Sequence, residues 1–444
     1  MDTLLQRSRD LKQALTDFVL DAEGDLAVAL ETFSADQLKR SQQQNMHQRT
    51  MVIDRFITEG NVGEQTPIDL FLQSEPDLSE SDRQLLTQWR RSFVGLFAIS
   101  KVLEDGFKMM NWTTAKPYIV KPNDPQVLKE MDRLKEGDII LTQIAPVTET
   151  DWTFSSPRTS LGRLGKPKLA VAIGNFKENY KNHLYGDAPE LLAEAWKSVE
   201  RYHEDFLSFF GTDEVTMPGY QLGKKLIEFQ ELLTEKSLEA SGIDRSKSLE
   251  ELAEEAGVSQ EELEAAADAM GADAKTVSQV WNHGKTQAKM AAPQIELPAH
   301  LKKAEQVTAL SHPRWGQMFL PSYHSFKSLL EADDWKNISN AEELVRRYLD
   351  DPQINAFVWH RLAQQYPKPM ETMLRDVLSR PDFDLEQDLD HLLQEFNKPL
   401  ETELPEIASV PLHLHNLFQE AVLEISKDKS KSKPKKKTAV GFQR

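Results

Sequence analysis

The basic, hydroxyl and amide side chains between Lys275 and Lys289 have types and a spacing that suggest a binding chemistry. Such groups, carried on one helix, can contact phosphates and base edges in a groove of DNA. The stretch 274–282, AKTVSQVWN, follows Gly271 and an apolar segment that starts at Leu263, which is the layout of a helix-turn-helix motif. The candidate nucleic-acid contacts are Lys275, Thr276, Ser278, Gln279, Lys285 and Lys289.

The same stretch also fits a purely structural role. Three potential helices lie between Ser248 and Asn282, and they can pack around a core of their own. That core would contain Leu249, Leu252, Leu263, Met270, Val277 and Trp281. The segment AKTVSQVWN resembles the recognition helix of the lactose-repressor family, in which the motif opens the chain. Here the motif is internal and follows an acidic segment, so a DNA-contacting helix and a small three-helix bundle both stay open.

Signatures of catalysis, of phosphate binding and of metal binding are missing from the sequence. There is no Cys, no HExxH and no GxSxG, and the stretch 160–168, SLGRLGKPK, lacks the first Gly of a phosphate-binding loop. His413 with His415, and His391 with Glu395, offer two metal ligands each, fewer than a zinc site requires. We therefore predict no catalytic, cofactor-binding or metal-ligating residues, although an enzyme of unrecognised type stays an alternative.

Aromatic side chains are densest in the stretch 312–326, HPRWGQMFLPSYHSF. Four rings recur there at spacings that could line a groove for a partner protein, and these are Trp315, Phe319, Tyr323 and Phe326. The alternative is that the four rings form the core of a domain whose turns contain Pro.

The elements that must position these residues are mostly helical, and the predicted fold class is α+β. Aromatic and β-branched runs separated by turn residues predict a small antiparallel sheet or barrel at about 93–155, where Asp105-Gly106 is a hairpin signal because both turn positions tolerate positive φ. The predicted divisions are a helical N-terminal region (1–90), a small β domain (91–165), a helical hairpin region (166–245), a three-helix, helix-turn-helix-like bundle (246–290), a linker (291–313), a helical C-terminal domain (314–424) and a disordered basic tail (425–444).

Charge is distributed unevenly along the 444 residues. The formal net charge is −18, but the last 19 residues carry +7, which leaves −25 for the rest. An acidic body repels nucleic-acid phosphates, whereas the Lys-rich tail can bind RNA, a membrane surface or an acidic protein. The sequence has no apolar run of about 18 residues, no secretory signal pattern and no Cys, so we expect a cytoplasmic protein without a transmembrane segment.

Residues 54–158 carry a family resemblance. The stretches FITEG, YIVKP, LKEGDIILTQIAPV and DWTFSS, in this order after a capped helix start at 79–82, resemble the helix-plus-β module of bacterial SEC-C-type proteins. The resemblance implies an interaction role. The zinc-binding Cys/His tail of that family has no counterpart here, because the chain has no Cys and ends in a Lys-rich stretch. The remaining chain has the general character of cyanobacterial proteins.

The sequence as a whole predicts a non-enzymatic interaction or assembly factor, an adaptor or scaffold with other proteins as partners. The features behind this prediction are several helical modules joined by Pro-containing turns, a basic tail and no recognisable catalytic set. The first alternative is a nucleic-acid-binding regulator that uses the 272–289 helix and the tail, and the second is an enzyme of unrecognised type.

Overall fold

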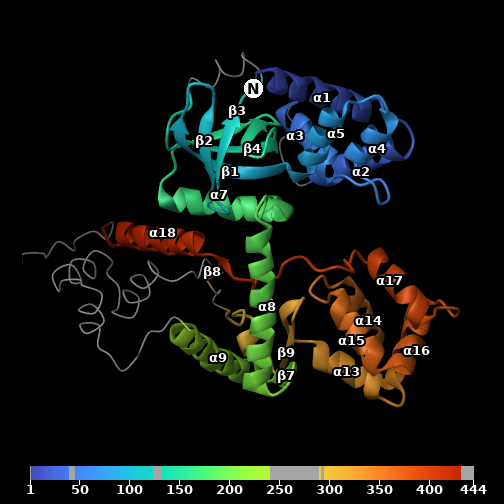
Figure 1. The fold of residues 1–444 in the computed structure, drawn as a ribbon. Coiled ribbons are helices and arrows are strands. Elements are labelled where there is room, and N and C mark those ends of the chain that lie inside the picture. Colours follow the sequence, from blue (N-terminus) through green and yellow to red (C-terminus); the bar gives the residue numbers. More distant parts are fainter. Residues whose placement is uncertain (1, 40–45, 124–132, 241–289, 292–294, 432–444) are drawn as a thin grey trace, which may run out of the picture. The chain divides into compact units, whose positions relative to one another are not determined.

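A computed structural model describes residues 2–39, 46–123, 133–240, 290–291 and 295–431 of the chain (Figure 1). The fold is α+β and mostly helical, which confirms the predicted fold class. The chain divides into two compact units: unit 1 comprises residues 1–192 and 411–444, and unit 2 comprises residues 193–410.

Unit 1 opens with a helical bundle. Its helices are α1 (Asp2–Leu20), α2 (Asp25–Lys39), α3 (Met46–Glu59), α4 (Pro67–Ser74) and α5 (Glu80–Gln88), followed by the short 3₁₀ helix η1 (Trp89–Arg91). Leu11, Leu15 and Val19 recur every fourth residue of α1 and are buried, so one stripe of this helix faces the core. As the sequence predicts, Ser79 caps α5, because its hydroxyl accepts the Asp82 backbone N–H.

The six strands of unit 1 form a small closed barrel with one added strand (Figure 1). They are β1 (Phe93–Val102), β2 (Phe107–Asn111), β3 (Pro117–Lys121), β4 (Ile139–Pro146), β5 (Asp151–Phe154) and β6 (Thr159–Gly162). The pairing order is β1-β2-β3-β5-β4, and β4 also pairs with β1, which closes the barrel. Strand β6 pairs with the first half of β4, on the same edge on which β5 pairs with its end. With β3 and β5 parallel and the other pairs antiparallel, this is the strand order of OB-fold barrels.

The barrel is filled by aromatic rings that alternate along the strands. Phe97, Tyr118 and Trp152 point inward, and the Tyr118 and Trp152 rings meet edge to face at 5.1 Å. The predicted hairpin joins β1 to β2, but Gly106 is required there for a reason other than positive φ. A Cβ at Gly106 would lie 2.5 Å from the carbonyl oxygen of Val120 on β3, so only Gly allows this approach.

Two helices cover one face of the barrel. They are α7 (Lys166–Asn179) and α18 (Leu412–Lys431), and the 3₁₀ helix η2 (Lys181–His183) follows α7. Leu414 and Leu417 of α18 share a buried cluster with Ile173 of α7 and Val94 of β1. Helix α18 therefore belongs to unit 1 and not to a continuous 314–424 domain, and it extends into the range predicted to be a disordered tail. Residues 432–444 lie outside the described part of the chain.

Unit 2 combines a three-stranded sheet with helices. Its elements are the continuation of α8 (Pro189–Phe210), β7 (Glu214–Met217), α9 (Gly219–Ala240), β8 (Met290–Ala291), η3 (Leu301–Lys303), β9 (Val307–His312), β10 (Gly316–Leu320), α13 (Tyr323–Glu331), η4 (Trp335–Asn337), α14 (Ala341–Asp350), α15 (Ala356–Gln365), α16 (Pro367–Leu378), α17 (Leu385–Glu395) and β11 (Val410–Pro411). Strand β9 lies between β7 and β10, all antiparallel, although residues 291–313 were predicted to be a linker. The strand exists because five of its six residues are buried in this sheet.

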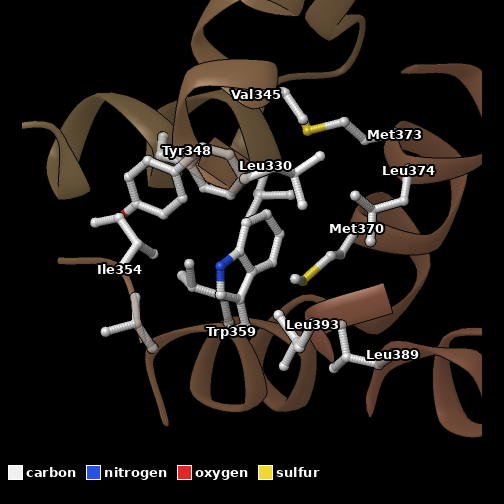
Figure 2. Packing of buried hydrophobic residues seen from close by; sticks show 14 of the residues in the cluster. Leu330, Val345, Tyr348, Ile354, Trp359, Met370, Met373, Leu374, Leu389 and Leu393 are labelled. Carbon is white, nitrogen blue, oxygen red and sulfur yellow. The ribbon is translucent and has the colours of Figure 1, made fainter. Parts of the chain in front are cut away.

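Trp359 on α15 occupies the centre of the helical core of unit 2. Figure 2 shows its indole among Tyr348, Met370 and Leu393, which come from α14, α16 and α17. The Phe326 ring stacks on Tyr348 at 4.1 Å between centroids and meets Trp359 edge to face. Side chains from four helices thus meet around one aromatic residue, which fixes the helices of this unit against each other.

Candidate functional site

An open groove with a volume of about 1140 Å³ lies in unit 1, between the helical bundle and the barrel. We call it the basic groove because its lining includes four cationic side chains, those of Arg9, Lys12, Arg133 and Arg158. Two carboxylates, those of Asp54 and Asp138, also line it. Seryl and threonyl hydroxyls make up much of the remaining surface.

One wall of the basic groove consists of residues from the helical bundle, and helical periodicity brings these residues together. Arg9, Lys12 and Thr16 lie three and four residues apart on α1, so they share one flank of this helix beside its buried stripe. Thr50 and Asp54 are one turn apart on α3 and face the same space. Two helices of the bundle therefore supply one wall.

The barrel supplies the other wall through the connection from β5 to β6. The Gln143 backbone N–H donates to Ser156 Oγ at 3.0 Å, and the Ser155 N–H donates to the Gln143 carbonyl at 2.9 Å. These bonds hold the backbone just before Arg158 against β4. Ser155 and Ser160 also line the groove, and a seryl hydroxyl can donate a hydrogen bond to a ligand.

Lys12 and Asp54 form an ion pair within this lining. The Lys12 Nζ and Asp54 Oδ1 atoms are 2.8 Å apart, and the two side chains are 18% and 7% exposed. Burial raises the pKa of Asp54, and the adjacent Lys12 ammonium opposes this rise. Lys12 and Asp54 therefore largely neutralise each other within the lining.

The balance of charge gives the basic groove its chemical character. Among the described lining residues, four side chains are cationic and two are carboxylates, in a chain whose net charge is −18. Most of these side chains are polar, whereas pockets for small organic molecules are lined mainly by apolar side chains. The described lining thus combines cationic and hydroxyl groups, which are hydrogen-bond donors for an anionic ligand.

The outer face of β2 and β3 differs from the basic groove. In OB-fold barrels this face carries the oligonucleotide or oligosaccharide ligand. Its outward side chains here are those of Lys108, Met110, Ile119 and Lys121, because the aromatic rings of both strands point into the barrel. The face offers no aromatic platform for stacked bases, which is the usual means of binding single strands.

A second polar cluster, the Arg361 network, lies in unit 2. Arg361 donates to both carboxylate oxygens of Asp213 at 2.6 and 2.9 Å and also contacts Glu214. Lys327 and the Tyr323 hydroxyl donate to Glu214 at 2.9 and 3.2 Å. The Arg361 hydrogen bonds lower the pKa of Asp213, with burial acting against them. Two cations and two carboxylates satisfy one another, so this network joins α13, α15 and β7 and has no excess charge.

Two histidines adjoin the Arg361 network. His312 Nδ1 accepts the backbone N–H groups of Arg314 and Trp315, both at 3.1 Å, and thereby holds the turn between β9 and β10. His203 Nδ1 lies 3.1 Å from the Ser311 hydroxyl. Burial lowers the pKa of both imidazoles. Both imidazoles thus form hydrogen bonds that belong to the fold. Ser311, which His203 contacts, is buried and therefore not accessible to a substrate.

The predicted site residues are placed as follows. The candidate nucleic-acid contacts, Lys275, Thr276, Ser278, Gln279, Lys285 and Lys289, lie outside the described residues. Tyr323 and Phe326 are fully buried in the core of unit 2, and Trp315 and Phe319 are partly buried. Two of the four rings proposed to line a partner groove thus face the protein interior.

The histidine pairs considered from the sequence are engaged in local contacts. His391 lies 3.0 Å from Glu395, but Glu395 is held by Arg380 in a two-point ion pair. His413 Nε2 lies 2.7 Å from the carbonyl oxygen of Trp112. The described residues contain no group of three or more His, Cys, Asp or Glu side chains placed to hold a metal ion.

Comparison with known proteins returned no match: no family model, no curated protein and no solved structure resembles this chain significantly. The resemblance of residues 54–158 to SEC-C-type proteins therefore stays a prediction. Among the described helices, none is both long and apolar enough to cross a lipid bilayer.

Proposed function

We propose that this protein is a non-enzymatic interaction or assembly factor whose basic groove binds an acidic segment of a partner protein. The observation that carries the proposal is the gathering of four cationic side chains among the described lining residues of one open groove in a strongly acidic chain. A concave surface of one sign concentrates oppositely charged ligands, and it does so most selectively when the rest of the molecule repels them. The interaction role implied by the SEC-C resemblance agrees with this proposal.

The size and polarity of the basic groove favour a polypeptide over a small molecule. Its volume of about 1140 Å³ is open to solvent and spans α1, α3 and the β5–β6 connection. An extended acidic segment can contact both walls at once, whereas a small anion would reach only part of the cationic set. Partner binding through such a groove requires no catalytic residue.

A nucleic-acid-binding regulator is the second candidate function. The same cations, together with the Lys-rich tail, support it because phosphates bind Arg and Lys irrespective of sequence. The outward faces of β2 and β3 argue for the protein partner, since they offer no ring on which bases could stack.

Affinity capture from the native cell tests the proposal with a matched pair of variants. Arg133→Glu with Arg158→Glu reverses charge in the basic groove, and Lys101→Glu with Lys108→Glu makes the same charge change on the exposed barrel strands. We expect partner proteins that the wild type and the strand variant retain and the groove variant loses. Direct binding of an acidic peptide from such a partner should follow the same pattern. Retention of all partners by the groove variant would overturn the proposal.

A further inference from the structure

We propose that a buried polar joint at the end of α3 holds the two walls of the basic groove at a fixed separation, and that Gln143 is its positioning residue. The joint consists of Thr58 and Glu59 on α3, Gln143 on β4 and His183 on η2, all in unit 1. None of these four side chains is part of the described lining of the groove. The inference rests on the proposed function, because it names the residues that shape the groove for its partner.

Gln143 is hydrogen-bonded to the elements that form both walls of the groove. Its side-chain Nε2 donates to the Thr58 hydroxyl on α3 at 3.0 Å. Its backbone N–H donates to Ser156 Oγ, and its carbonyl accepts the Ser155 N–H, so the same residue holds the β5–β6 connection. One residue of the barrel thus contacts the bundle through its side chain and the opposite wall through its backbone.

The bond to Thr58 acts on the lining along one flank of α3. Thr50, Asp54 and Thr58 lie four residues apart on this helix, and the first two line the groove. The α1 part of the same wall is packed on α3, because Leu15 of α1 and Ile57 of α3 share one buried core. A shift of the last turn of α3 would therefore move the whole bundle wall.

Glu59 and His183 form the second contact of the joint. The Val94 backbone N–H donates to His183 Nδ1 at 3.3 Å, so the ring proton is on Nε2, which lies 2.7 Å from Glu59 Oε1. Strand β2 pairs with β1 from Phe97 onward, so Val94 lies beyond its end and uses the imidazole as acceptor. Burial would raise the pKa of Glu59, but hydrogen bonds from Arg55 and His183 lower it to about 2. The carboxylate therefore stays charged and holds the end of α3 against the barrel.

The cost of burying the Gln143 amide points to a positioning role. The side chain is fully buried, and its Oε1 has no hydrogen-bond partner among the described residues. An unpaired buried acceptor costs free energy, and a leucine of similar shape would avoid that cost. What the amide supplies is a directional contact with Thr58, which an apolar side chain cannot make.

Distance measurements by electron–electron resonance test the inference on the full chain. The sequence has no Cys, so spin labels attached through Gln13→Cys on α1 and Ser160→Cys on β6 report the separation of the two walls. We expect a narrow distance distribution without further changes, and one about twice as wide when Thr58→Val and Gln143→Leu are combined. Thr58→Ser keeps the hydroxyl and should leave the distribution narrow.

Ile57→Val is the matched control for stability. It removes one buried methyl group from the residue beside Thr58 and destabilises the bundle core without touching the joint. The distance distribution should stay narrow in this variant. An unchanged distribution in the joint variant, or equal broadening by Ile57→Val, would overturn the inference.

Peptide affinity connects the joint to the proposed function. The probe is a fluorescein-labelled peptide of nine glutamates, and its anisotropy is measured with proteins that carry no spin labels. The variant with Thr58→Val and Gln143→Leu should bind it about fivefold more weakly than the wild type, because a wall that is free to move loses conformational freedom on binding. Thr58→Ser and Ile57→Val should bind it as the wild type does.

The two measurements separate the inference from the proposed function. A wider distance distribution with unchanged peptide affinity would overturn the role of the joint in binding and leave the proposed function standing. Failure of the nonaglutamate to bind the folded wild type would contradict the proposed function, while the distance distributions would still decide whether the joint holds the walls.

Discussion

The basic groove of unit 1 and the Arg361 network of unit 2 are both clusters of charged side chains, yet they are built on opposite principles. In the Arg361 network, two cations and two carboxylates neutralise one another, and the Arg361 side chain is only 16% exposed. In the basic groove, four cationic side chains and two carboxylates among the described residues line an open surface. The first arrangement supports a fold, and the second is suited to receive a ligand.

The difference between these two clusters shows how charged side chains can be interpreted in a chain that matches no known protein. A search for perturbed pKa values would include the Arg361 network, because the Arg361 hydrogen bonds lower the pKa of Asp213. Structural ion pairs shift pKa values as functional groups do, however, and the carboxylates there already hold their partners. What marks the basic groove is the gathering of four cationic side chains together with access for a ligand.

Charge reversal in the basic groove should have the largest effect and should separate binding from stability. Replacing Arg133 and Arg158 with Glu is expected to weaken binding of an acidic partner peptide about 100-fold, or about 2.8 kcal/mol. The melting temperature should change little, because both side chains lie at the rim of unit 1 and not in its core. Anisotropy and thermal melting measure the two quantities, and a large loss of stability would show that the groove is structural instead.

Removing Arg361 should lower the stability of unit 2 and leave peptide affinity unchanged. Arg361→Met leaves Asp213 and Glu214 partly buried and without their shared cation, and we expect unfolding to become easier by about 2 kcal/mol. Affinity for an acidic partner peptide should stay within twofold of the wild type. Arg380→Met, which breaks a solvent-exposed pair with Glu395, serves as the control and should have a much smaller effect on stability. Urea denaturation measures both, and equal effects of the two variants would contradict a special role for the network.

A fall in pH should lower the stability of unit 2 because its histidines take up protons. The effect should be smaller than that of Arg361→Met. His312 faces His203, Asp213, Arg314 and Arg361, and its folded pKa is lowered chiefly by burial. Because the unfolded imidazole keeps its ordinary pKa of about 6.5, it takes up a proton first as the pH falls. Stability should thus be level above pH 6.5 and decline below it.

Asparagine at position 312 provides the control for this pH dependence. Its side-chain oxygen can accept the Arg314 and Trp315 N–H groups in place of Nδ1, and it does not titrate. Urea denaturation between pH 7.5 and 5.5 should therefore give a flatter profile for His312→Asn than for the wild type. Identical profiles would exclude His312 as a source of the decline.

Removal of one hydroxyl from the basic groove should have the smallest effect. Ser155→Ala deletes a neutral donor while the backbone bond from Ser155 to Gln143 remains. One hydrogen bond contributes about 0.5 to 1.5 kcal/mol, so we expect affinity for an acidic partner peptide to fall about threefold. Anisotropy would measure it, and an unchanged affinity would remove Ser155 from the set of contacts.

Local sequence signals predicted the parts of the fold that depend on neighbouring residues. Aromatic and β-branched runs between turn residues predicted the strands at 93–155, and Ser79 predicted the start of α5. Closure of the barrel depends on β1 pairing with β4, which no local pattern reports. In the same way, α18 could be assigned to unit 1 only through its contacts with α7, far away in the sequence.

The basic groove escaped prediction because its members come from five separate segments of the chain. Arg9 and Lys12 flank Asp10 on a helix of mixed charge, so no basic run marks them in the sequence. Ring spacing predicted a partner groove that includes Tyr323 and Phe326, but both rings are buried in the core. The same spacing of aromatic residues is found whether the rings line a groove or fill a core. Only the tertiary fold distinguishes the two.

Hydrogen–deuterium exchange of the full chain, with and without a saturating acidic peptide from a captured partner, tests the central comparison most directly. The basic groove should gain protection in segments 9–16, 50–54 and 155–160, while segments 213–214 and 358–362 of the Arg361 network should exchange at unchanged rates. Protection confined to strands β2 and β3 or to the Arg361 network would contradict the assignment of the groove as the site that receives the ligand.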